Sequence, residues 1–331
     1  MSAKYSRIIS TGSALPAARI TNEDLARRLA ADGIETSDEW IRTRTGIEAR
    51  RFVNGTTETT TTLAAAAAQK ALEGSGVDPK TIDLIIVATT TPDQVFPSTA
   101  AAVQRLIGAA GCAAFDVQAV CAGFIYALNA ADAMLRAGPY QRALVIGAET
   151  MSRVIDMKDR ATCVLFGDGA GAVVLEASAK PGILAARMYA DGSYDENVLG
   201  LTARIDHGEL CGRPYINMDG RQVFKLAVDG LTSSAQEVAV LAGVDPQDVD
   251  VYIPHQANLR IMTMVAKKLG IPDERMIKTV SEQGNTSAAS VPLALDEAVR
   301  SGKISDGSLV LLQAVGAGMA WGSAIVRWRS E

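Results

Sequence analysis

The sequence AAFDVQAVCAGFIYALNAADAML, residues 113–135, predicts a buried strand that runs directly into a helix. Its first part is apolar and alternates between residues 115 and 119, which is typical of a strand. In its second part, apolar side chains recur at the three- and four-residue spacing of a helix, at Phe124, Leu128, Ala131 and Leu135. Gly138 and Pro139 end the helix. A strand followed at once by a helix is the repeating unit of α/β folds.

Cys121 lies at the junction of this strand and helix, with only the small residues Ala122 and Gly123 beside it. The first-turn N–H groups and the helix dipole favour a thiolate there, which is the nucleophilic form of cysteine. A lone cysteine in an apolar segment is also often just a small buried side chain. Cys121 is therefore a candidate nucleophile, and a purely structural role stays open at this point.

The composition of the 331-residue chain is that of a globular protein with a large core, because 48% of its residues are hydrophobic and 21% are charged. The formal net charge of −5 argues against a nucleic-acid-binding protein, since no basic excess is present to neutralise phosphates. No apolar run approaches the roughly 20 residues that span a bilayer. We therefore expect neither a nucleic-acid partner nor a membrane segment.

The N-terminal sequence MSAKYSRIIS lacks the long apolar core of a signal peptide. Four cysteines without a CxxC pair, together with two histidines, argue against a zinc site or a disulfide scaffold. We accordingly expect a protein of the reducing cytoplasm, with no metal and no bound cofactor.

Two sequence patterns recur in the second half of the chain, which indicates an internal duplication. GVDPxxID at residues 76–83 returns as GVDPxxVD at residues 243–250, and DxxLRxG at residues 132–138 returns as DxxVRxG at residues 296–302. The offsets are 167 and 164 residues, so that order and spacing are both kept. Strands alternating with helices predict mainly parallel sheets covered by helices. We expect two halves, residues 1–180 and 181–331, whose equivalent strand ends meet at one site.

The second half carries two polar residues at places that correspond to Cys121. His255 follows a predicted strand at residues 251–253, and Asn285 precedes the helix that matches the one after Cys121. Each also has an ordinary explanation, as a partly buried histidine and as an asparagine N-cap in a turn. Together with Cys121 they suit acyl transfer: the thiolate holds an acyl group, while the imidazole and carboxamide donate to an enolate oxygen.

Residues 40–51 combine Trp40 with several arginines, among them Arg44. Such a segment is either a solvated basic face or a site for a phosphorylated ligand, on which Trp40 would stack. The local sequence leaves both interpretations open.

The whole chain resembles the β-ketoacyl-[acyl-carrier-protein] synthase III family, the condensing enzymes of the thiolase superfamily that start bacterial fatty-acid synthesis. The resemblance rests on TSDEWIRTRTGI, FDVQAVCAGF, FGDGAGAVVL, IPHQANLRI, GNTSAAS and AWGSAIVRW. It implies an α/β fold of two pseudo-symmetric halves in five layers, αβαβα. It also implies that Cys121 accepts the acyl group, and that His255 and Asn285 form the decarboxylation and condensation site.

The reaction implied by the resemblance is a decarboxylative Claisen condensation of an acyl-CoA primer, most simply acetyl-CoA, with malonyl-acyl carrier protein. It yields 3-oxoacyl-carrier protein, CO2 and coenzyme A, and it needs no separate cofactor. Two alternatives stay open. One is a related acyltransferase of a secondary pathway with an unusual primer or acceptor, and the other is a member that only binds carrier protein. The intact Cys-His-Asn set argues against the second.

Further residues receive roles from the resemblance alone. Trp40, Arg44 and Arg160 match positions that hold coenzyme A. The positions that match contacts to the acidic carrier protein are Lys225, Gln256, Arg260, Lys267 and Lys268. The last two lie seven and eight residues after Arg260, which places all three on one helix face.

The resemblance also assigns the oxyanion hole to the backbone N–H groups of Cys121 and Ala317. The family's terminal glycine triplet is Gly316-Ala317-Gly318 here. Alanine can donate the same N–H but tolerates a positive φ poorly, so the sequence leaves the efficiency of acyl transfer open. A homodimer is implied as well, with the depth of the acyl pocket set by loops such as residues 93–96, from this subunit or its partner. The remaining cysteines match no catalytic position: Cys112, Cys163 and Cys211.

Overall fold

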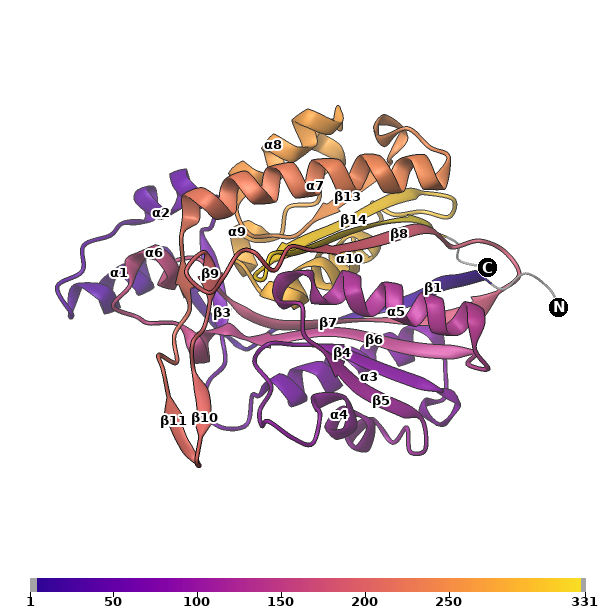
Figure 1. Ribbon diagram of the computed structural model, residues 1–331, viewed down its shortest axis with the longest axis horizontal. Coiled ribbons are helices and arrows are strands. Elements are labelled where there is room, and N and C mark those ends of the chain that lie inside the picture. Colours follow the sequence, from indigo (N-terminus) through magenta and orange to yellow (C-terminus); the bar gives the residue numbers. More distant parts are fainter. Residues whose placement is uncertain (1–4, 329–331) are drawn as a thin grey trace.

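Two β-sheets lie face to face, with helices between them and on both outer sides (Figure 1). The structure is a computed structural model that describes residues 5–328, so the outermost residues of the two predicted halves lie outside it. The principal helices are α3 (Thr60–Ser75), α4 (Thr99–Ile107), α5 (Gly123–Ala137), α7 (Gly220–Ala242), α8 (Leu259–Leu269) and α10 (Ser290–Arg300). Helices α3 and α4 cover the first sheet, α5 and α10 lie between the sheets, and α7, with α8 beside it, covers the second sheet. The predicted five-layer αβαβα arrangement is confirmed.

The two sheets repeat one strand order. The first is β1-β7-β6-β4-β5 and the second is β8-β15-β14-β13 in the same direction. An isolated parallel bridge between Tyr252 and Met276 stands in the second sheet where β5 stands in the first. The strands are β1 (Tyr5–Ala14), β4 (Leu84–Ala88), β5 (Ala113–Val117), β6 (Arg142–Thr150), β7 (Asp168–Ser178), β8 (Ile183–Ala190), β13 (Val251–Pro254), β14 (Leu309–Gly316) and β15 (Ala320–Arg327).

The expectation of mainly parallel sheets is wrong, because both sheets are mixed. Strand β4 runs parallel to β5 and β6, and β13 runs parallel to β14, but the other neighbours in both sheets are antiparallel. For β14 and β15 the connection explains the antiparallel direction. Only residues 317–319 separate β14 from β15, and a parallel pair requires a crossover of a dozen or more residues.

The repeated sequence patterns form the same local structures twice. Asp78 and Asp245 each cap a short 3-10 helix that starts with proline, at Pro79–Thr81 and Pro246–Asp248. Asp132 of α5 and Asp296 of α10 are both buried, and each lies four residues before an arginine with which it forms an ion pair. The duplication seen in the sequence is thus expressed in local structure in both halves.

Strand β1 connects the two central helices. The Ser6 hydroxyl donates to Asp132 over 2.7 Å, and the Thr11 and Ser13 hydroxyls donate to Asp296 over 2.7 and 2.5 Å. Buried carboxylates need such donors, because an unpaired polar group in the interior is costly. These bonds fix the relative position of α5 and α10, whose N-terminal ends carry the site described below.

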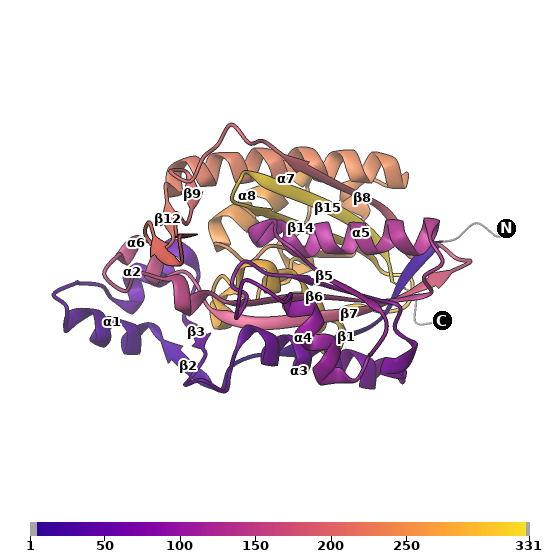
Figure 2. The ribbon, with the colours of Figure 1, turned by 60° about the horizontal axis from the view of Figure 1, so that its bottom comes forward.

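A lobe of short elements flanks one end of the sheets (Figure 2), and the β10–β11 hairpin projects from it. No helix within residues 5–328 is both long and apolar enough to cross a membrane. The elements of the lobe and its surroundings are α1 (Asn22–Ala30), α2 (Asp38–Thr45), α6 (Arg160–Cys163), α9 (Val280–Gln283), β2 (Ala18–Thr21), β3 (Ala49–Phe52), β9 (Leu199–Gly200), β10 (Arg204–Asp206), β11 (Glu209–Cys211) and β12 (Asn217–Met218).

Candidate active site

Cys121 lies in the turn that joins β5 to α5. This turn is the 3-10 helix η2 (Val120–Ala122), and Val120 adopts a φ of 47°, which is rare for a β-branched residue. Such a conformation persists only where the surrounding structure holds it, as is common at active sites. Gly316, at the end of β14, lies so close that an added Cβ atom would come within 2.7 Å of the Cys121 N atom. A strand of the second half therefore closes directly over the thiol-bearing turn.

His255 follows β13 and is buried. Its backbone N–H donates to the Gln313 carbonyl of β14 over 2.7 Å, and its Nδ1 atom lies 2.5 Å from the Ser290 hydroxyl. Burial lowers the pKa of His255 to about 3, so the ring is neutral at physiological pH. A neutral imidazole can donate from one ring nitrogen while the other accepts.

Asn285 is buried between α9 and the 3-10 helix η6 (Ser287–Ala289). Its backbone N–H donates to Leu165 O, and its Oδ1 atom accepts a 2.8 Å hydrogen bond from the Ser287 N–H. With Oδ1 turned toward the backbone, the Nδ2 amide is the end of the side chain that remains to donate. The carboxamide is thereby oriented by its own turn.

The predicted Cys, His and Asn converge on one segment, residues 285–290. Asn285 begins the segment, the turn at Ser287 packs against the turn that carries Cys121, and Ser290 bonds to the ring of His255. The first half of the chain supplies the thiol, and the second supplies both nitrogen donors. The structure therefore brings together three residues that are far apart in the sequence.

The environment of the thiol differs from what the helix N-terminus predicts. Burial raises the pKa of Cys121 to about 12, against a smaller lowering by the hydrogen bond from Ser287. Desolvation of the charged form outweighs the helix dipole in this enclosed position. Burial therefore opposes the thiolate that the helix N-terminus is expected to favour, and deprotonation of the free thiol needs a proton acceptor.

The backbone at Ala317, which the resemblance assigns to the oxyanion hole, is not strained. Ala317 is not among the residues with positive φ, whereas its neighbour Gly318 has a φ of 105°. The conformation that only glycine adopts easily thus falls on a glycine, and alanine fits at the middle position of the turn. Backbone strain therefore imposes no cost at Ala317.

The three residues predicted to hold coenzyme A lie together. The guanidinium groups of Arg44 and Arg160 lie 4.6 and 4.4 Å from the ring centroid of Trp40. Arg160 also donates to the Glu35 carbonyl over 2.6 Å. Arg50, in contrast, is fully buried and donates to carbonyl groups of the fold. Only part of the arginine-rich segment therefore forms an exposed, cationic and aromatic surface.

A basic surface lies on the packed helices α7 and α8. We define it by the exposed residues Lys225, Arg260, Lys267 and Lys268. Lys268 is paired across the two helices with Asp229, at 3.3 Å. The surface is basic although the whole chain carries a net charge of −5.

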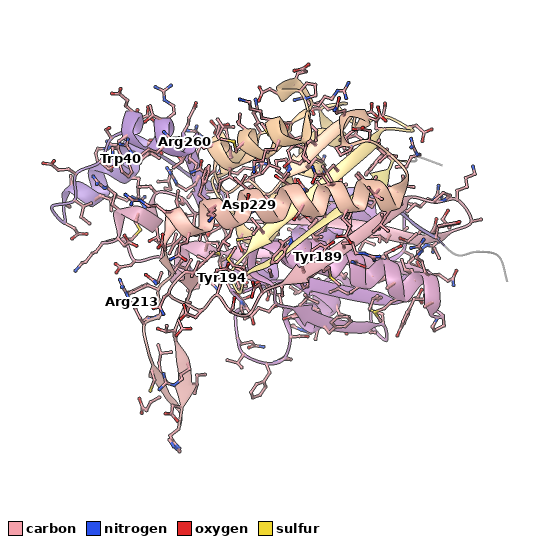
Figure 3. All side chains as sticks on the ribbon, turned by 45° about the horizontal axis from the view of Figure 1, so that its top comes forward. Trp40, Tyr189, Tyr194, Arg213, Asp229 and Arg260 are labelled. Atoms are coloured by element: carbon pink, nitrogen blue, oxygen red, sulfur yellow. The ribbon has the colours of Figure 1, made fainter. Side chains whose placement is uncertain are left out.

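The basic surface is continuous with the Trp40 surface. The Arg260 side chain donates to the Thr43 carbonyl of α2 over 3.1 Å, and the Asn258 amide donates to the Arg44 carbonyl over 3.1 Å. Figure 3 shows Trp40 and Arg260 on the same side of the molecule, with Asp229 further along α7. A ligand held by Trp40 and a partner held by α8 would therefore approach the site from one side.

Gln256 does not belong to this surface. Its side chain is fully buried, and its Nε2 group donates to Pro254 O and Ile277 O. Its Oε1 atom accepts from the Thr279 and Val280 N–H groups. The prediction that Gln256 contacts a carrier protein is wrong, because the side chain is buried. Its hydrogen bonds hold β13 against the residues at the start of α9.

Sequence reasoning missed three polar residues of the candidate site: Glu149, Ser287 and Ser290. The two serines lie within the GNTSAAS motif, and their position next to Asn285 could have indicated that they belong to the site. Glu149 ends the apolar strand RALVIGAET, and a carboxylate in a buried run points to a specific role.

Comparison with known proteins identifies the family. The 3-oxoacyl-[acyl-carrier-protein (ACP)] synthase III family matches residues 115–192, and its C-terminal family matches residues 240–328. The 3-oxoacyl-[acyl-carrier-protein] synthase III of Aquifex aeolicus is 48% identical, with a TM-score of 0.90, covering 98% of this chain and 100% of that one. The enzyme of Thermus thermophilus is 40% identical, with a TM-score of 0.90 and the same coverage.

A priming β-ketosynthase from the R1128 polyketide biosynthetic pathway is also similar. It is 37% identical, with a TM-score of 0.92, covering 98% of this chain and 96% of that one. The chain belongs to the 3-oxoacyl-[acyl-carrier-protein] synthase III family and is a thiolase-like condensing acyltransferase that initiates fatty-acid synthesis.

Proposed function

We propose that this enzyme transfers the acyl group of an acyl-CoA primer, most simply acetyl-CoA, to Cys121 and then condenses it with malonyl-acyl carrier protein. The observation that carries the proposal is the convergence of Cys121, His255 and Asn285 on residues 285–290. A thiol, a neutral imidazole and an oriented carboxamide are the groups that the two half-reactions require.

In the first half-reaction, the Cys121 sulfur attacks the thioester carbonyl and coenzyme A leaves. The backbone N–H groups of Cys121 and Ala317 stabilise the oxyanion, a role that the close approach of Gly316 to the Cys121 turn supports. Arg44 and Arg160 hold the phosphates, and Trp40 offers its ring to the base.

In the second half-reaction, malonyl-carrier protein loses CO2 and the resulting enolate attacks the acyl-Cys121 carbonyl. Negative charge grows on the malonyl thioester oxygen as CO2 leaves. His255, through Nε2–H, and Asn285, through Nδ2–H, donate to that oxygen. The carrier protein, which is acidic, docks on the basic surface.

Trapping of the acyl-enzyme tests the proposal. Incubation with acetyl-CoA alone should add one acetyl group, which peptide mass spectrometry should locate on Cys121. Cys121→Ala should abolish the modification, whereas Cys112→Ala should leave it intact. Acetyl groups on Cys112, Cys163 or Cys211 in place of Cys121 would overturn the assignment of the nucleophile.

A second candidate function is the priming of a polyketide pathway with a different acyl group. The likeness to the R1128 priming ketosynthase favours it, although the identity is lower than that to the Aquifex aeolicus enzyme. A panel of acyl-CoA primers, assayed with malonyl-carrier protein, separates the two. An enzyme of fatty-acid synthesis should show its highest kcat/KM with acetyl-CoA or a branched short primer. An enzyme that primes a polyketide pathway should prefer a different acyl group.

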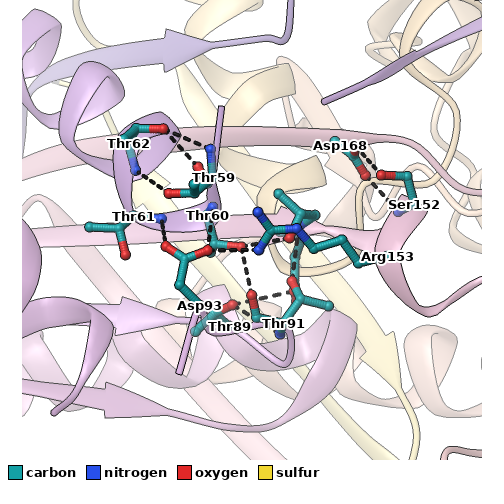
Figure 4. Close-up of polar contacts among 12 residues, drawn as sticks. Thr59, Thr60, Thr61, Thr62, Thr89, Thr91, Asp93, Ser152, Arg153 and Asp168 are labelled. Carbon is teal, nitrogen blue, oxygen red and sulfur yellow. Dashed lines mark hydrogen bonds and ion pairs between the residues drawn. The ribbon is translucent and has the colours of Figure 1, made fainter. Parts of the chain in front are cut away.

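The enzyme is proposed to act as a homodimer. Val95 and Phe96 are 75% and 82% exposed at the tip of a loop, which is costly for apolar side chains in water. The base of this loop is anchored, because Asp93 accepts from the Thr60 and Thr61 N–H groups and pairs with Arg153 at 2.7 Å (Figure 4). Strand β5, beside the loop, is an edge strand. A second copy would cover both features.

Sedimentation velocity tests the dimer. A double substitution Val95→Asp and Phe96→Asp should shift the protein toward monomer. Val240→Asp is the matched control, since Val240 is an equally exposed apolar residue on α7. A wild-type monomer at micromolar concentration would contradict the proposal.

A further inference from the structure

Glu149 is a buried carboxylate next to the nucleophile that the reaction described above does not use. Its side chain is fully buried at the end of β6. It accepts hydrogen bonds from the hydroxyls of Thr89 and Thr90 and from the Thr90 N–H, at 3.0–3.3 Å, and also from the Thr91 hydroxyl. Within residues 5–328 it forms no salt bridge, so no cation neutralises it.

Ser287 connects Glu149 to Cys121. Its hydroxyl donates to Glu149 Oε1 over 3.0 Å, and its turn, η6, packs against η2, where the Ser287 side chain lowers the pKa of the Cys121 thiol. Ser287 has a φ of 48°, and Val120, next to Cys121, has a φ of 47°. Two strained residues, one from each half, thus hold the hydroxyl between the thiol and the carboxylate.

A hydroxyl has one proton to donate and two lone pairs with which to accept. Ser287 therefore cannot donate to both neighbours at once. Either the thiol donates to Ser287 and Ser287 to Glu149, or the protonated carboxyl donates to Ser287 and Ser287 to the thiolate. The two arrangements differ by one proton moved from sulfur to carboxylate.

We propose that Glu149 takes up the Cys121 proton through Ser287 and stores it for as long as the acyl group occupies the sulfur. The proposal rests on Cys121 being the acyl-accepting nucleophile. Glu149 touches no substrate, so it acts as a positioning residue for the thiol proton.

The proton balance over one cycle closes. In acylation the thiol proton moves to the Glu149 carboxylate, the C–S bond to Cys121 forms, the C–S bond to coenzyme A breaks, and the released CoA thiolate takes a proton from solvent. In condensation the bond between the malonyl α-carbon and its carboxylate breaks and CO2 leaves without the electron pair. The α-carbon uses that pair to form the new C–C bond as the acyl–Cys121 bond breaks. The released Cys121 thiolate then recovers the stored proton from Glu149.

The charges in the site make this storage useful. Burial raises the pKa of Glu149, and it raises that of Cys121 to about 12, so a thiol at this position does not ionise readily into water. When Glu149 accepts the proton, Cys121 and Glu149 together keep a single negative charge. A second buried charge is thereby avoided. Once the enzyme is acylated, the thioester and the protonated Glu149 are both neutral. The negatively charged malonyl carboxylate then meets no negative charge on Cys121 or Glu149.

The test measures acylation of Cys121 against pH in wild type and Glu149→Gln. The glutamine keeps the shape of the carboxylate and one accepting oxygen, but it cannot store a proton. We expect wild-type acylation to be nearly constant between about pH 7 and pH 9. In Glu149→Gln the rate should fall about 10²-fold at pH 7 and rise about tenfold per pH unit, because the thiolate must then form by loss of a proton to solvent.

Infrared spectroscopy supplies a direct readout. The difference spectrum of acetylated minus free wild type should gain the C=O stretch of a protonated carboxyl, and the Glu149→Gln spectrum should lack that band. Ser287→Ala should behave as Glu149→Gln does in the pH series, which keeps the test valid if Glu149→Gln folds poorly. Alkylation of Cys121 by iodoacetamide gives the same pH series without any acyl substrate, so it stays informative even if acetyl-CoA is not the primer.

Asp168→Asn is the matched control. Asp168 is likewise a fully buried carboxylate, on the neighbouring strand β7, and accepts from Ser152 and from the Val53 N–H over 2.8 Å. The Asp168→Asn variant should show the wild-type dependence of Cys121 acylation on pH, even if the substitution lowers the stability of the protein. A flat pH series in Glu149→Gln, or a uniform loss of rate with no change of slope, would overturn the proposal.

Discussion

The Nδ1 atom of His255 lies 2.5 Å from the Oγ atom of Ser290, the first residue of α10. Ser290 Oγ also accepts a 3.4 Å hydrogen bond from the Gln256 N–H, which favours donation of the serine proton to Nδ1. The proton of the neutral ring is then on Nε2. The second half of the chain thus presents His255 to the site as a donor.

The two half-reactions should separate in His255→Ala and Asn285→Ala. Both variants should still form acetyl-Cys121, because acyl transfer uses the sulfur and backbone N–H groups. Release of CO2 from malonyl-carrier protein should fall by about 10²–10³-fold, the typical cost of removing one oxyanion donor. Mass spectrometry measures the first half-reaction and radiolabelled CO2 the second. Decarboxylation near the wild-type rate in both variants would refute the assigned roles.

His255 should make the stability of the protein depend on pH. The pKa of this residue is lowered by burial to about 3, against about 6.5 in an unfolded chain. Between these values the unfolded chain binds a proton that the folded protein does not, so the free energy of unfolding falls as the pH drops below about 6.5. At pH 5 the loss from this group is about 2 kcal/mol.

Urea unfolding at about pH 7.5 and pH 5 measures this effect. His255→Asn removes the titrating group, so wild type should lose about 2 kcal/mol more than the variant over this interval. Buried carboxylates with raised pKa values, such as Asp132 and Asp168, are present in both proteins and cancel in the comparison. Equal losses in the two proteins would mean that His255 is not held neutral.

The basic surface should matter for the carrier protein and not for coenzyme A. Lys267→Glu combined with Lys268→Glu should raise the KM for malonyl-carrier protein while leaving acetylation of Cys121 nearly unchanged. The wild-type rate with carrier protein should also fall as salt rises, because exposed charges are screened over about 8–10 Å at physiological ionic strength. Lys180→Glu with Lys303→Glu reverses two exposed lysines outside α7 and α8 and serves as the control. Equal losses in both half-reactions would point to a disturbed fold.

Trp40 should contribute to the binding of coenzyme A alone. In this structure the guanidinium groups of Arg160 and Arg44 lie 4.4 and 4.6 Å from the ring centroid of Trp40, so an adenine base that stacks on the ring shares it with a guanidinium group or displaces one. Trp40→Ala and Arg160→Ala should each raise the KM for acetyl-CoA by up to about tenfold, in line with cation–π and stacking energies of 1 kcal/mol or so. The condensation rate of pre-acylated enzyme should not change. A loss in that second step would assign these residues to the carrier protein instead.

The sequence by itself determined the local elements and the identity of the chemical groups. Residues 113–135 predicted a strand, a turn and a helix because side-chain periodicity acts between residues only a few positions apart. The strand was expected to be buried, but β5 lies at the edge of its sheet and is only half-buried. The repeated GVDP and DxxxR patterns revealed the duplication, and the motifs around Cys121, His255 and Asn285 indicated the family. The mixed direction of the strands was missed, since it depends on how distant strands pair.

Only the tertiary structure decided what surrounds these groups. Gln256 lies in the same motif as His255 and Arg260, but packing buries its side chain. Nothing in the local sequence distinguishes it from Arg260, which is exposed. The raised pKa of Cys121 arises from burial by segments far away in the chain. Ser287 and Glu149 are 138 residues apart and meet only because the two halves pack face to face. Burial and hydrogen-bond partners are properties of such long-range packing, whereas periodicity and motifs are properties of neighbours in sequence.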